Sequence, residues 1–262
     1  MTTPLATYLP QLRDAVASSS RVVLLLDFDG TLAPLVQRPE LAALPQPTRA
    51  ALTALQSSPR VTLAFISGRA LADLRSRVGL NAIYAGNHGL EIEGPGLDFH
   101  GVDLIQSTEV LRAVSAKLAE KLHAIPGAQV EDKQSSLSVH YRNVDPSLAP
   151  RVKQITQSVT ASYTNFVVLH EGKLVIEVRP RVDWHKGKAA EWILQQIASP
   201  APLIIAMGDD RTDEDIFRSV PDSISIKVGE GPTSARFRVG DPGEVGRVLE
   251  LIREAVSCRA TV

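Results

Sequence analysis

Short, almost wholly apolar runs alternate with stretches of helical periodicity over much of this chain, and this alternation limits its fold more than any other feature. Strands that are apolar on both faces must be covered on both faces, which is typical of parallel sheets flanked by helices. The runs that predict strands are Val22–Leu26, Val61–Ile66, 82–85, 203–207 and 223–228. Helices are predicted over 48–56, 70–78, 188–198, 213–220 and 244–256. We therefore expect an α/β fold.

The middle third of the chain has a different pattern. Helical spacing covers 108–124 and 148–162, apolar and polar residues alternate around 137–142, and a hairpin is predicted from 167 to 178. Strands with one polar face suit a small α+β layer better than a continued parallel sheet. We predict a Rossmann-like core formed by 1–103 and 182–262, with a smaller α+β domain inserted at 104–181. The segments 94–96 and 180–183 are the expected hinges.

Composition narrows the function. The 262 residues include 28 Lys and Arg against 29 Asp and Glu, a net charge of −1, and 5% aromatic residues. Nucleic-acid binders usually carry a basic excess or aromatic platforms, and apolar runs of at most five residues are too short for a membrane span. The single cysteine, Cys258, cannot form an internal disulfide, and the first residues lack a secretion signal. We expect a cytoplasmic monomer with a small-molecule substrate, no nucleic-acid partner and no membrane partner.

Two carboxylates follow the first apolar run directly, in the segment Asp27-Phe28-Asp29-Gly30-Thr31. Ligand sites of open parallel sheets lie beyond the carboxyl ends of the strands. A sharp turn at Gly30 would bring both carboxylates to one site, where one can attack and the other can move protons. The alternative is an Asp-rich turn without chemistry, since Asp and Gly favour turns.

A second acidic cluster follows the run at 203–207, where five of the seven residues from 209 to 215 are acidic. Acidic residues in the first turn of a helix interact favourably with its dipole, which accounts for Asp213 and the acids after it. It does not account for Asp209 and Asp210, which precede the predicted helix. Crowded carboxylates with no His or Cys nearby suit a hard cation such as Mg²⁺.

Two weaker signals complete the set. Ser67-Gly68-Arg69 follows the run Val61–Ile66, where a hydroxyl and backbone N–H groups can hold phosphate oxygens, although an N-cap and turn is the plainer interpretation. Lys186 precedes a predicted helix and supplies a cation, although a lone lysine is usually a solvated surface residue. The order of the carboxylate pair, Ser67, Lys186 and the acidic cluster along the chain favours the functional interpretation of both Ser67 and Lys186.

The order of carboxylate pair, hydroxyl, lysine and acidic cluster resembles the haloacid-dehalogenase superfamily of phosphatases. The position of an insert between the second and third elements resembles the cap-bearing sugar-phosphatase branch of that superfamily. Within this branch, the chain is similar to the trehalose-6-phosphate phosphatases. The similar segments are LDFDGTL at 26–32, ISGR at 66–69, AGNHGLE at 85–91, VHYR at 139–142, EGKLVIEVRP at 171–180, HKG at 185–187 and GDDRTDE at 208–214. They span nearly the whole chain. With no glycosyltransferase domain before them, the resemblance implies a stand-alone phosphatase.

The resemblance implies a Mg²⁺-dependent hydrolysis of trehalose 6-phosphate through an aspartyl-phosphate. Asp27 is the implied nucleophile, ionised at an ordinary pKa of about 3.9, and Asp29 is the implied acid and base. The residues implied for the metal are Asp27, Asp29 through its backbone carbonyl, and Asp209, oriented by Asp210 and Asp213. The residues implied for the phosphate are Thr31, Ser67 and Lys186. The residues implied for the sugar are Arg69, Asn87, His88, Glu131, Lys133, Arg142, Lys173 and Glu177.

Several alternatives stay open from the sequence. The charged residues of the insert are ordinarily read as a solvated face rather than as a sugar site. The same machinery serves phosphatases of other sugar phosphates, such as sucrose phosphate or a glycosyl-phosphoglycerate, and phosphosugar mutases. A catalytically inactive sugar-phosphate sensor is a further class, but such a chain should have lost Asp27, Asp29 or the acidic cluster, and all are present.

Overall fold

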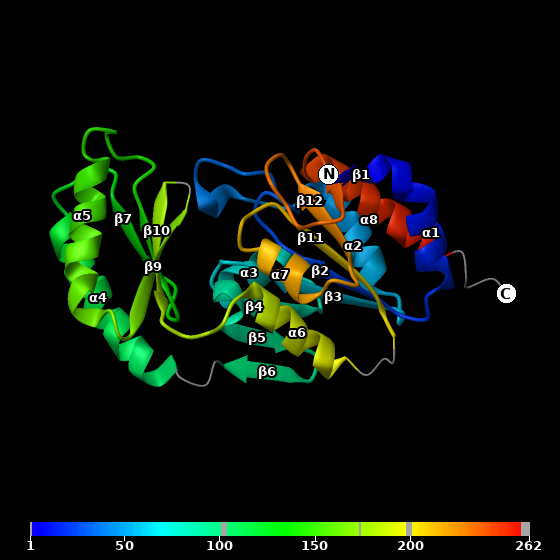
Figure 1. The fold of residues 1–262 in the computed structure, drawn as a ribbon, viewed down its shortest axis with the longest axis horizontal. Coiled ribbons are helices and arrows are strands. Elements are labelled where there is room, and N and C mark those ends of the chain that lie inside the picture. Colours follow the sequence, from blue (N-terminus) through cyan, green and yellow to red (C-terminus); the bar gives the residue numbers. More distant parts are fainter. Residues whose placement is uncertain (1, 101–103, 173, 198–200, 258–262) are drawn as a thin grey trace. The chain divides into compact units, whose positions relative to one another are not determined.

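Nine strands of the described residues form one sheet, with β2 near its centre (Figure 1). In spatial order these strands are β1 (Thr3–Pro4), β13 (Phe237–Val239), β12 (Ile224–Val228), β11 (Leu203–Gly208), β2 (Val22–Leu26), β3 (Val61–Ile66), β4 (Ile83–Gly86), β5 (Glu91–Gly94) and β6 (Leu97–His100). Neighbours from β1 to β4 are parallel, and β5 pairs with β4 antiparallel. From β2 the chain builds outward through β3 and β4 on one side, and through β11 and β12 on the other. In open parallel sheets, ligands bind at such a reversal of strand order, outside the carboxyl ends of the strands, which here are the ends of β2 and β11.

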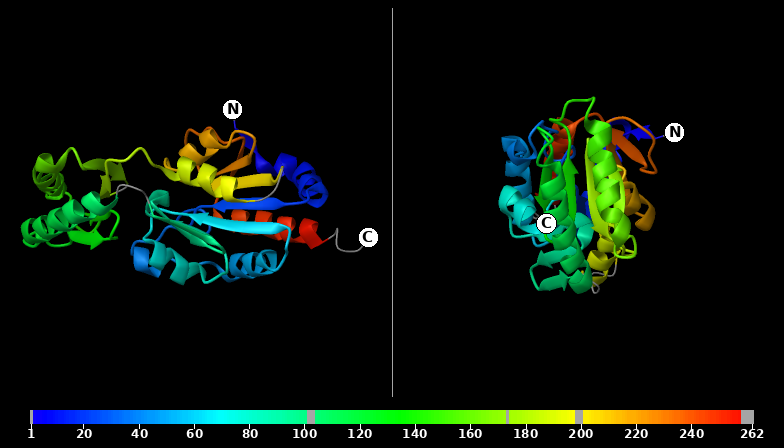
Figure 2. Two further views of the ribbon diagram at one scale, coloured as in Figure 1. Left: turned by 90° about the horizontal axis from the view of Figure 1, so that it is seen from below. Right: turned by 90° about the vertical axis from the view of Figure 1, so that its left-hand side faces the viewer.

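Helices cover both faces of this sheet, as Figure 2 also shows. The helices on one face are α1 (Leu9–Ser18), α2 (Gln46–Gln56), α3 (Leu71–Val78) and α8 (Pro242–Ser257), and those on the other are α6 (Lys186–Gln196) and α7 (Glu214–Ser219). In β2, Leu24 and Leu26 belong to the first core and Val23 and Leu25 to the second, and all are buried. The predicted α/β core with helices on both faces is therefore confirmed.

The protein is described here from a computed structural model, which covers residues 2–100, 104–172, 174–197 and 201–257. The chain divides into two compact units: unit 1 comprises Met1–Phe99 and Trp184–Val262, and unit 2 comprises His100–Asp183. The sequence had suggested boundaries at 103/104 and 181/182. Cys258 lies outside the described residues.

In its described residues, unit 2 has a four-stranded antiparallel sheet, two α-helices and a short 3-10 helix, Ala161–Tyr163. Its strands, in spatial order, are β7 (Gln129–Asp132), β8 (Leu137–His140), β10 (Val175–Pro180) and β9 (Val167–Gly172), and its helices are α4 (Leu104–Leu122) and α5 (Ala149–Thr160). Both α-helices lie on the same side of this sheet (Figure 1). They share a core with apolar side chains of the sheet such as Val139 and Ile176. This agrees with the predicted α+β insert.

The sequence analysis missed a hairpin at one edge of the large sheet. The segment 94–96, expected to be a hinge, joins β5 to β6 within unit 1, and Gly96 takes a φ of +75° in the turn. Each strand has four residues in which apolar and charged side chains alternate too briefly to give a clear period. The strands β1, β7 and β13 and the helix α1 were also not predicted.

Aromatic side chains of unit 1 meet at the two places where the chain passes to unit 2. Phe99 stacks on Trp184 with ring centroids 4.8 Å apart and lies 5.0 Å from the ring of Trp192. The indole Nε1 of Trp184 donates a hydrogen bond to the carbonyl of Gly89 at 2.6 Å. Stacked rings and a bonded indole fix both chain segments to the core of unit 1.

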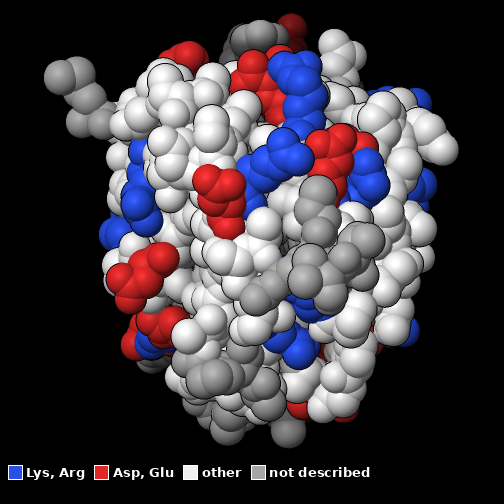
Figure 3. Space-filling model, turned by 90° about the vertical axis from the view of Figure 1, so that its right-hand side faces the viewer, with Lys and Arg blue, Asp and Glu red and all other residues white. Residues whose placement is uncertain are grey.

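Charges of both signs are interspersed on the face drawn in Figure 3, in keeping with a net charge of −1. None of the helices in the described ranges combines the length and the apolar character that crossing a membrane requires.

Candidate active site

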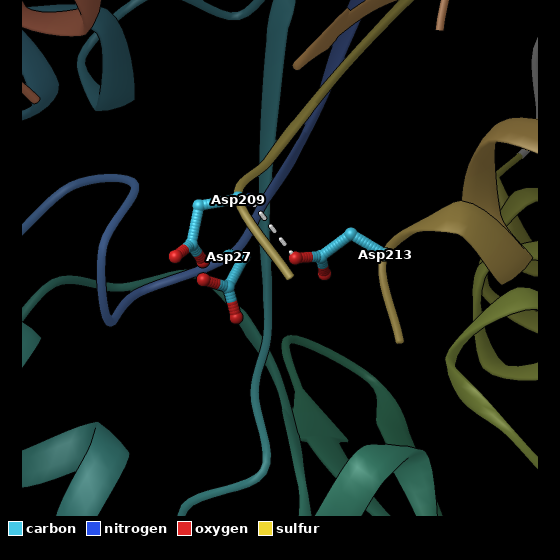
Figure 4. A group of neighbouring side chains, drawn as sticks. All are labelled: Asp27, Asp209 and Asp213. Carbon is cyan, nitrogen blue, oxygen red and sulfur yellow. Dashed lines mark hydrogen bonds between the residues drawn. The ribbon is translucent and has the colours of Figure 1, made fainter. Parts of the chain in front are cut away.

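The site is formed where β2 and β11 end side by side. The register pairs Leu26 with Met207, and Asp27 N–H donates to the Met207 carbonyl at 3.0 Å. Adjacent parallel strands therefore place Asp27 and Asp209, which follow them, next to each other. Figure 4 shows these carboxylates together with that of Asp213, from the residue just before α7.

The chain turns sharply after β2. Gly30 has a φ of +81°, its N–H donates to the Ala33 carbonyl at 2.8 Å, and the N–H groups of Leu32 and Ala33 both donate to the Phe28 carbonyl. A Cβ atom on Gly30 would lie 2.1 Å from Oδ2 of Asp209. Only glycine satisfies both the dihedral angle and this close approach.

Lys186, the first residue of α6, neutralises part of the acidic cluster. Its Nζ donates to Oδ1 of Asp27 at 2.7 Å and to Oδ1 of Asp213 at 2.8 Å. The side chains of Lys186, Asp27 and Asp213 are only 2%, 5% and 0% exposed. Buried charges at this depth must be paired, and here one ammonium group serves two carboxylates.

Asp213 also organises the loop that follows β11. Its second oxygen accepts hydrogen bonds from the backbone N–H groups of Asp209 and Asp210, at 3.1 and 3.0 Å. The side chain of Asp210 is exposed and accepts from the backbone N–H of Arg211. The Asp213 side chain thus orients the backbone of Asp209 and Asp210. Asp210 takes part in this contact through its backbone N–H and not through its carboxylate.

A buried lysine that the sequence analysis did not single out lies on the neighbouring strand. Lys227 of β12 donates through Nζ to the backbone carbonyl of Asp209. Lys227 is the one charged residue in 223–228, a run predicted to be a buried strand. A charge at such a position could have indicated that Lys227 has a buried partner.

Burial and neighbouring negative charge raise the pKa of two of the carboxyl groups, Asp27 and Asp209. Burial, and then the charge of Asp213, raises the pKa of Asp27 well above its usual range, although Lys186 opposes the change. Burial and Asp213 likewise raise the pKa of Asp209 to about 7. The expectation that Asp27 has an ordinary pKa is therefore wrong for the site without a cation.

The donor set fits a hard divalent cation. Oxygens of Asp27, Asp209 and Asp213 lie within 4.8 Å of one another, and Oδ1 of Asp209 is buried without a hydrogen-bond partner among the described residues. A divalent cation would relieve the repulsion that raises the two pKa values. Carboxylate-only clusters of this kind suit Mg²⁺ better than zinc.

Two hydroxyl groups lie in the neighbouring turns. Thr31 is buried, and its Oγ1 has no hydrogen-bond partner in the described part of the chain. Ser67 is buried after β3, where its Oγ accepts from the backbone N–H of Arg69 at 3.2 Å. The Thr31 hydroxyl is thus available to a ligand oxygen, and that of Ser67 can still donate its proton.

Three residues that the resemblance assigned to the sugar make protein contacts in unit 1. Arg69 forms ion pairs with Asp29 and Asp73. Asn87 donates to Glu91 through Nδ2 at 3.1 Å, and the backbone N–H groups of Asn87 and His88 donate to the carbonyls of Arg69 and Ser67. Asn87 and His88 adopt φ values of +49° and +60°, unusual for residues other than glycine. This strained turn braces the segment that carries Ser67 and Arg69.

The remaining candidates belong to unit 2. Glu131, Ser138 and Glu177 are paired across β7, β8 and β10, so their side chains lie on one sheet face, opposite the buried Leu137 and Val139. Glu131 accepts from Nε2 of His140 at 2.8 Å and lies 3.9 Å from Nζ of Lys133. Arg142 is exposed just beyond β8, and Lys173 lies outside the described residues.

A family model described as trehalose-phosphatase matches residues 25–242. The chain belongs to the trehalose-phosphatase family. The matched range includes both halves of the unit 1 site and all of unit 2. The resemblance to the trehalose-6-phosphate phosphatases that the sequence indicated is confirmed at the level of the family.

Individual relatives agree with this family. The chain is 39% identical over 246 residues to a trehalose-phosphate phosphatase of Mycobacterium tuberculosis, covering 87% of this chain and 61% of that protein. It therefore spans about three fifths of that relative. Its fold is similar to the C-terminal domain of a C. albicans trehalose-6-phosphate phosphatase, with a TM-score of 0.80, 26% identity and coverage of 97% and 98%. A haloacid dehalogenase-like hydrolase of Bacteroides thetaiotaomicron shares the fold alone, with a TM-score of 0.66, 14% identity and coverage of 89% and 99%.

Proposed function

We propose that this chain is a Mg²⁺-dependent phosphatase that hydrolyses trehalose 6-phosphate in trehalose biosynthesis. The observation that carries the proposal is the buried Asp27 at the carboxyl end of β2, bonded to Lys186 and adjacent to Asp209. A nucleophilic carboxylate, a buried cation and a hard-metal donor set are what phosphoryl transfer requires. Membership of the trehalose-phosphatase family, and the names of its relatives, support the substrate.

The proposed reaction has two steps on the same carboxylate. An oxygen of Asp27 bonds to phosphorus as the bond from phosphorus to the sugar oxygen breaks, and Asp29 gives its proton to that oxygen. Water then bonds to phosphorus and loses a proton to Asp29, while the bond between phosphorus and Asp27 breaks. Phosphate leaves and both carboxyl groups return to their starting state.

The other residues bind and neutralise. Mg²⁺, held by Asp27, Asp209 and the backbone carbonyl of Asp29, would supply positive charge beside the phosphoryl oxygens. Lys186, with the hydroxyls of Thr31 and Ser67, would bind those oxygens. We propose that Asp213 and Asp210 hold the Asp209 loop in place, the former through the backbone bonds described above.

We propose that unit 2 is the cap that recognises the sugar. Its support is the polar sheet face that carries Glu131, Lys133 and Glu177. Lys173, which lies outside the described residues, is included from the resemblance alone. A disaccharide offers many hydroxyl groups, and sites that pair such groups reject analogues that lack them.

Phosphate release from a panel of sugar phosphates with Mg²⁺ tests this function. We expect trehalose 6-phosphate to have a kcat/KM well above those of sucrose phosphate and glucose 6-phosphate. Equal turnover of these substrates would overturn the trehalose assignment and leave a broader sugar phosphatase. Transfer of the phosphoryl group to a second sugar would indicate a mutase, and binding without turnover would indicate a sensor.

A further inference from the structure

The carboxylate of Asp29 is held by a guanidinium group at both oxygens. Nε of Arg69 donates to Oδ2 and Nη2 donates to Oδ1, each at 2.6 Å. The two parallel bonds fix the plane of the carboxylate, because the guanidinium fork is rigid. Each carboxylate oxygen retains further lone-pair capacity, so the pairing still allows contact with a proton or a substrate oxygen. Asp29 is 35% exposed in this arrangement, whereas Arg69 is only 10% exposed.

The position of Arg69 is itself set from the opposite side. Its Nη1 donates to Oδ2 of Asp73 at 2.6 Å, and its Nη2 also donates to the Pro39 carbonyl at 2.9 Å. The guanidinium carbon lies 5.2 Å from the centre of the Phe28 ring. The four donor contacts and the ring leave the fork little freedom to rotate.

Asp73 is anchored in turn by Arg77, one helical turn further along α3. Nε of Arg77 donates to both oxygens of Asp73 at 2.9 and 2.8 Å, and its Nη1 donates to the carbonyls of Ala42 and Glu40 at 2.8 and 3.1 Å. Burial alone would raise the pKa of Asp73, but the bonds from Arg77 and Arg69 outweigh it and the pKa is lowered. Asp73 is therefore a fixed anion between two cations.

The four groups alternate in sign: Asp29, Arg69, Asp73 and Arg77. Without the negative charge of Asp73, two guanidinium groups would face each other across the gap, and Arg69 would keep only Asp29 as an anionic partner. The Arg69 fork could then turn, and with it the plane of the Asp29 carboxylate that it holds. A proton donor must be aligned with the leaving oxygen, so a carboxyl group whose plane is not fixed transfers its proton less efficiently.

We propose that Asp73, anchored by Arg77, is a positioning residue that holds Asp29, through Arg69, in the orientation from which it donates its proton. This inference rests on the proposed phosphatase function, and it gives Arg69 a positioning role in place of the sugar contact implied by the resemblance. Asp73 acts at a distance from the reacting atoms and is not a catalytic residue.

The test uses how strongly kcat/KM depends on the leaving group. From 4-nitrophenyl phosphate to phenyl phosphate, the leaving phenolate becomes more basic, so its departure depends increasingly on a proton from the enzyme. The aryl groups are of similar size, so their binding differs little. In Asp73→Asn, we expect kcat/KM to be nearly unchanged for 4-nitrophenyl phosphate and to fall about tenfold for phenyl phosphate, part of what general acid catalysis contributes. Trehalose 6-phosphate should lose at least as much as phenyl phosphate.

Arg75→Gln is the matched control, because Arg75 lies on the same helix and its ion pair, with Glu93 at 2.9 Å, is at the surface. It should leave the whole series unchanged. Arg69→Lys keeps the charge but not the fork, and it tests the same step if Asp73→Asn does not fold. A uniform fall across the series, or an equal effect of Arg75→Gln, would overturn the proposal.

A second measurement does not depend on turnover. The Nε–H proton of Arg69 should give an NMR signal that exchanges slowly with water, and Asp73→Asn should speed this exchange at least severalfold. An unchanged exchange rate would contradict the proposed coupling. If the unaltered chain released phosphate from none of these substrates, the proposed function would fail, whereas the exchange experiment would still decide whether Asp73 fixes Arg69.

Discussion

Two regions of this molecule gather acidic and basic side chains, and they differ in how far those charges are buried. At the ends of β2 and β11 in unit 1, Lys186 and its two aspartates are at most 5% exposed. On the polar sheet face of unit 2, Glu131 is 47% exposed and Glu177 is 18% exposed. The first region fixes its partners during folding, because buried charges cannot remain unpaired. On the second, Glu131 keeps hydrated oxygens that can exchange water for the hydroxyl groups of a ligand, whereas Lys133 is only 10% exposed and Glu177 pairs with Arg179.

The difference also predicts how each region tolerates change. Removing one partner of a buried ion pair leaves an uncompensated charge and typically costs about 3–5 kcal/mol, whereas exposed pairs contribute about 0–1 kcal/mol. Substitutions that leave Lys186 without an anionic partner should therefore affect both chemistry and folding. Substitution of the exposed Glu131 on the unit 2 face should affect substrate selection with little effect on folding.

The largest expected effect is that of Asp27→Asn. The amide cannot attack phosphorus, so kcat should fall by at least about a thousandfold, as for other lost nucleophiles. Lys186 retains Asp213 as a partner, and the midpoint of thermal unfolding should change by only a few degrees. Asp29→Asn should also be severe, and the exposed Asp98→Asn is the control. Retention of more than a few per cent of activity by Asp27→Asn would exclude an aspartyl-phosphate.

Removal of divalent cations should have a nearly equal effect on activity. A chelator should abolish phosphate release, and Mg²⁺ should restore it. Asp209→Ala should raise the Mg²⁺ concentration needed for half-maximal activity more than Asp210→Ala, because Asp210 is exposed. Ca²⁺ should inhibit, since its looser coordination misplaces the nucleophile. Full activity in excess chelator would contradict the assignment of the acidic cluster.

A smaller and more selective effect is expected on the unit 2 face. Replacing Glu131, Lys133, Lys173 or Glu177 by Ala should lower kcat/KM for trehalose 6-phosphate about tenfold to a hundredfold each, the value of one hydrogen bond to a charged group. The kcat/KM for a small aryl phosphate should stay within about twofold, because it lacks the second glucose. Glu120→Gln on the exposed side of α4 is the matched control. Equal losses for both substrates would place these residues outside sugar recognition.

The smallest effect concerns the stability of the metal-free protein. Because burial raises the pKa of Asp209 to about 7, the folded form holds a proton between about pH 4 and pH 7 that the unfolded form has lost. The free energy of unfolding should therefore fall as pH rises through this window. The expected change is a few degrees in the unfolding midpoint, measured by calorimetry, and Asp209→Asn or added Mg²⁺ should reduce it. A midpoint that rises steadily from pH 4 to pH 7 would contradict the direction.

The ends of the central strands could be predicted from the sequence because each apolar run stops abruptly at polar residues. The bounds of Val22–Leu26 and Val61–Ile66 agree with β2 and β3, since polar residues follow each run at once. The edge hairpin of β5 and β6 was missed because four-residue strands give too short a period. Its turn contains Gly and Pro, which also occur in hinges.

The side-chain partners were harder to predict than the elements. The resemblance implied a sugar contact for Arg69, and no local sequence pattern indicated its pairing with Asp29, forty residues earlier in the chain. Asp73 and Arg77 are four residues apart on α3, a spacing at which opposite charges commonly pair on a helix surface without any further role. Local spacing indicates which side chains share a helix face, but not which loop packs against that face.

The aromatic contacts of Phe99 give the protein an optical property. The chain contains two tryptophans, Trp184 and Trp192, and both rings lie against Phe99 in unit 1. Intrinsic tryptophan emission therefore arises wholly from the place where the chain leaves unit 1 and returns to it. Any ligand that alters this junction should change the emission wavelength or intensity, so unlabelled protein can be titrated with substrates and cations in a simple fluorimeter.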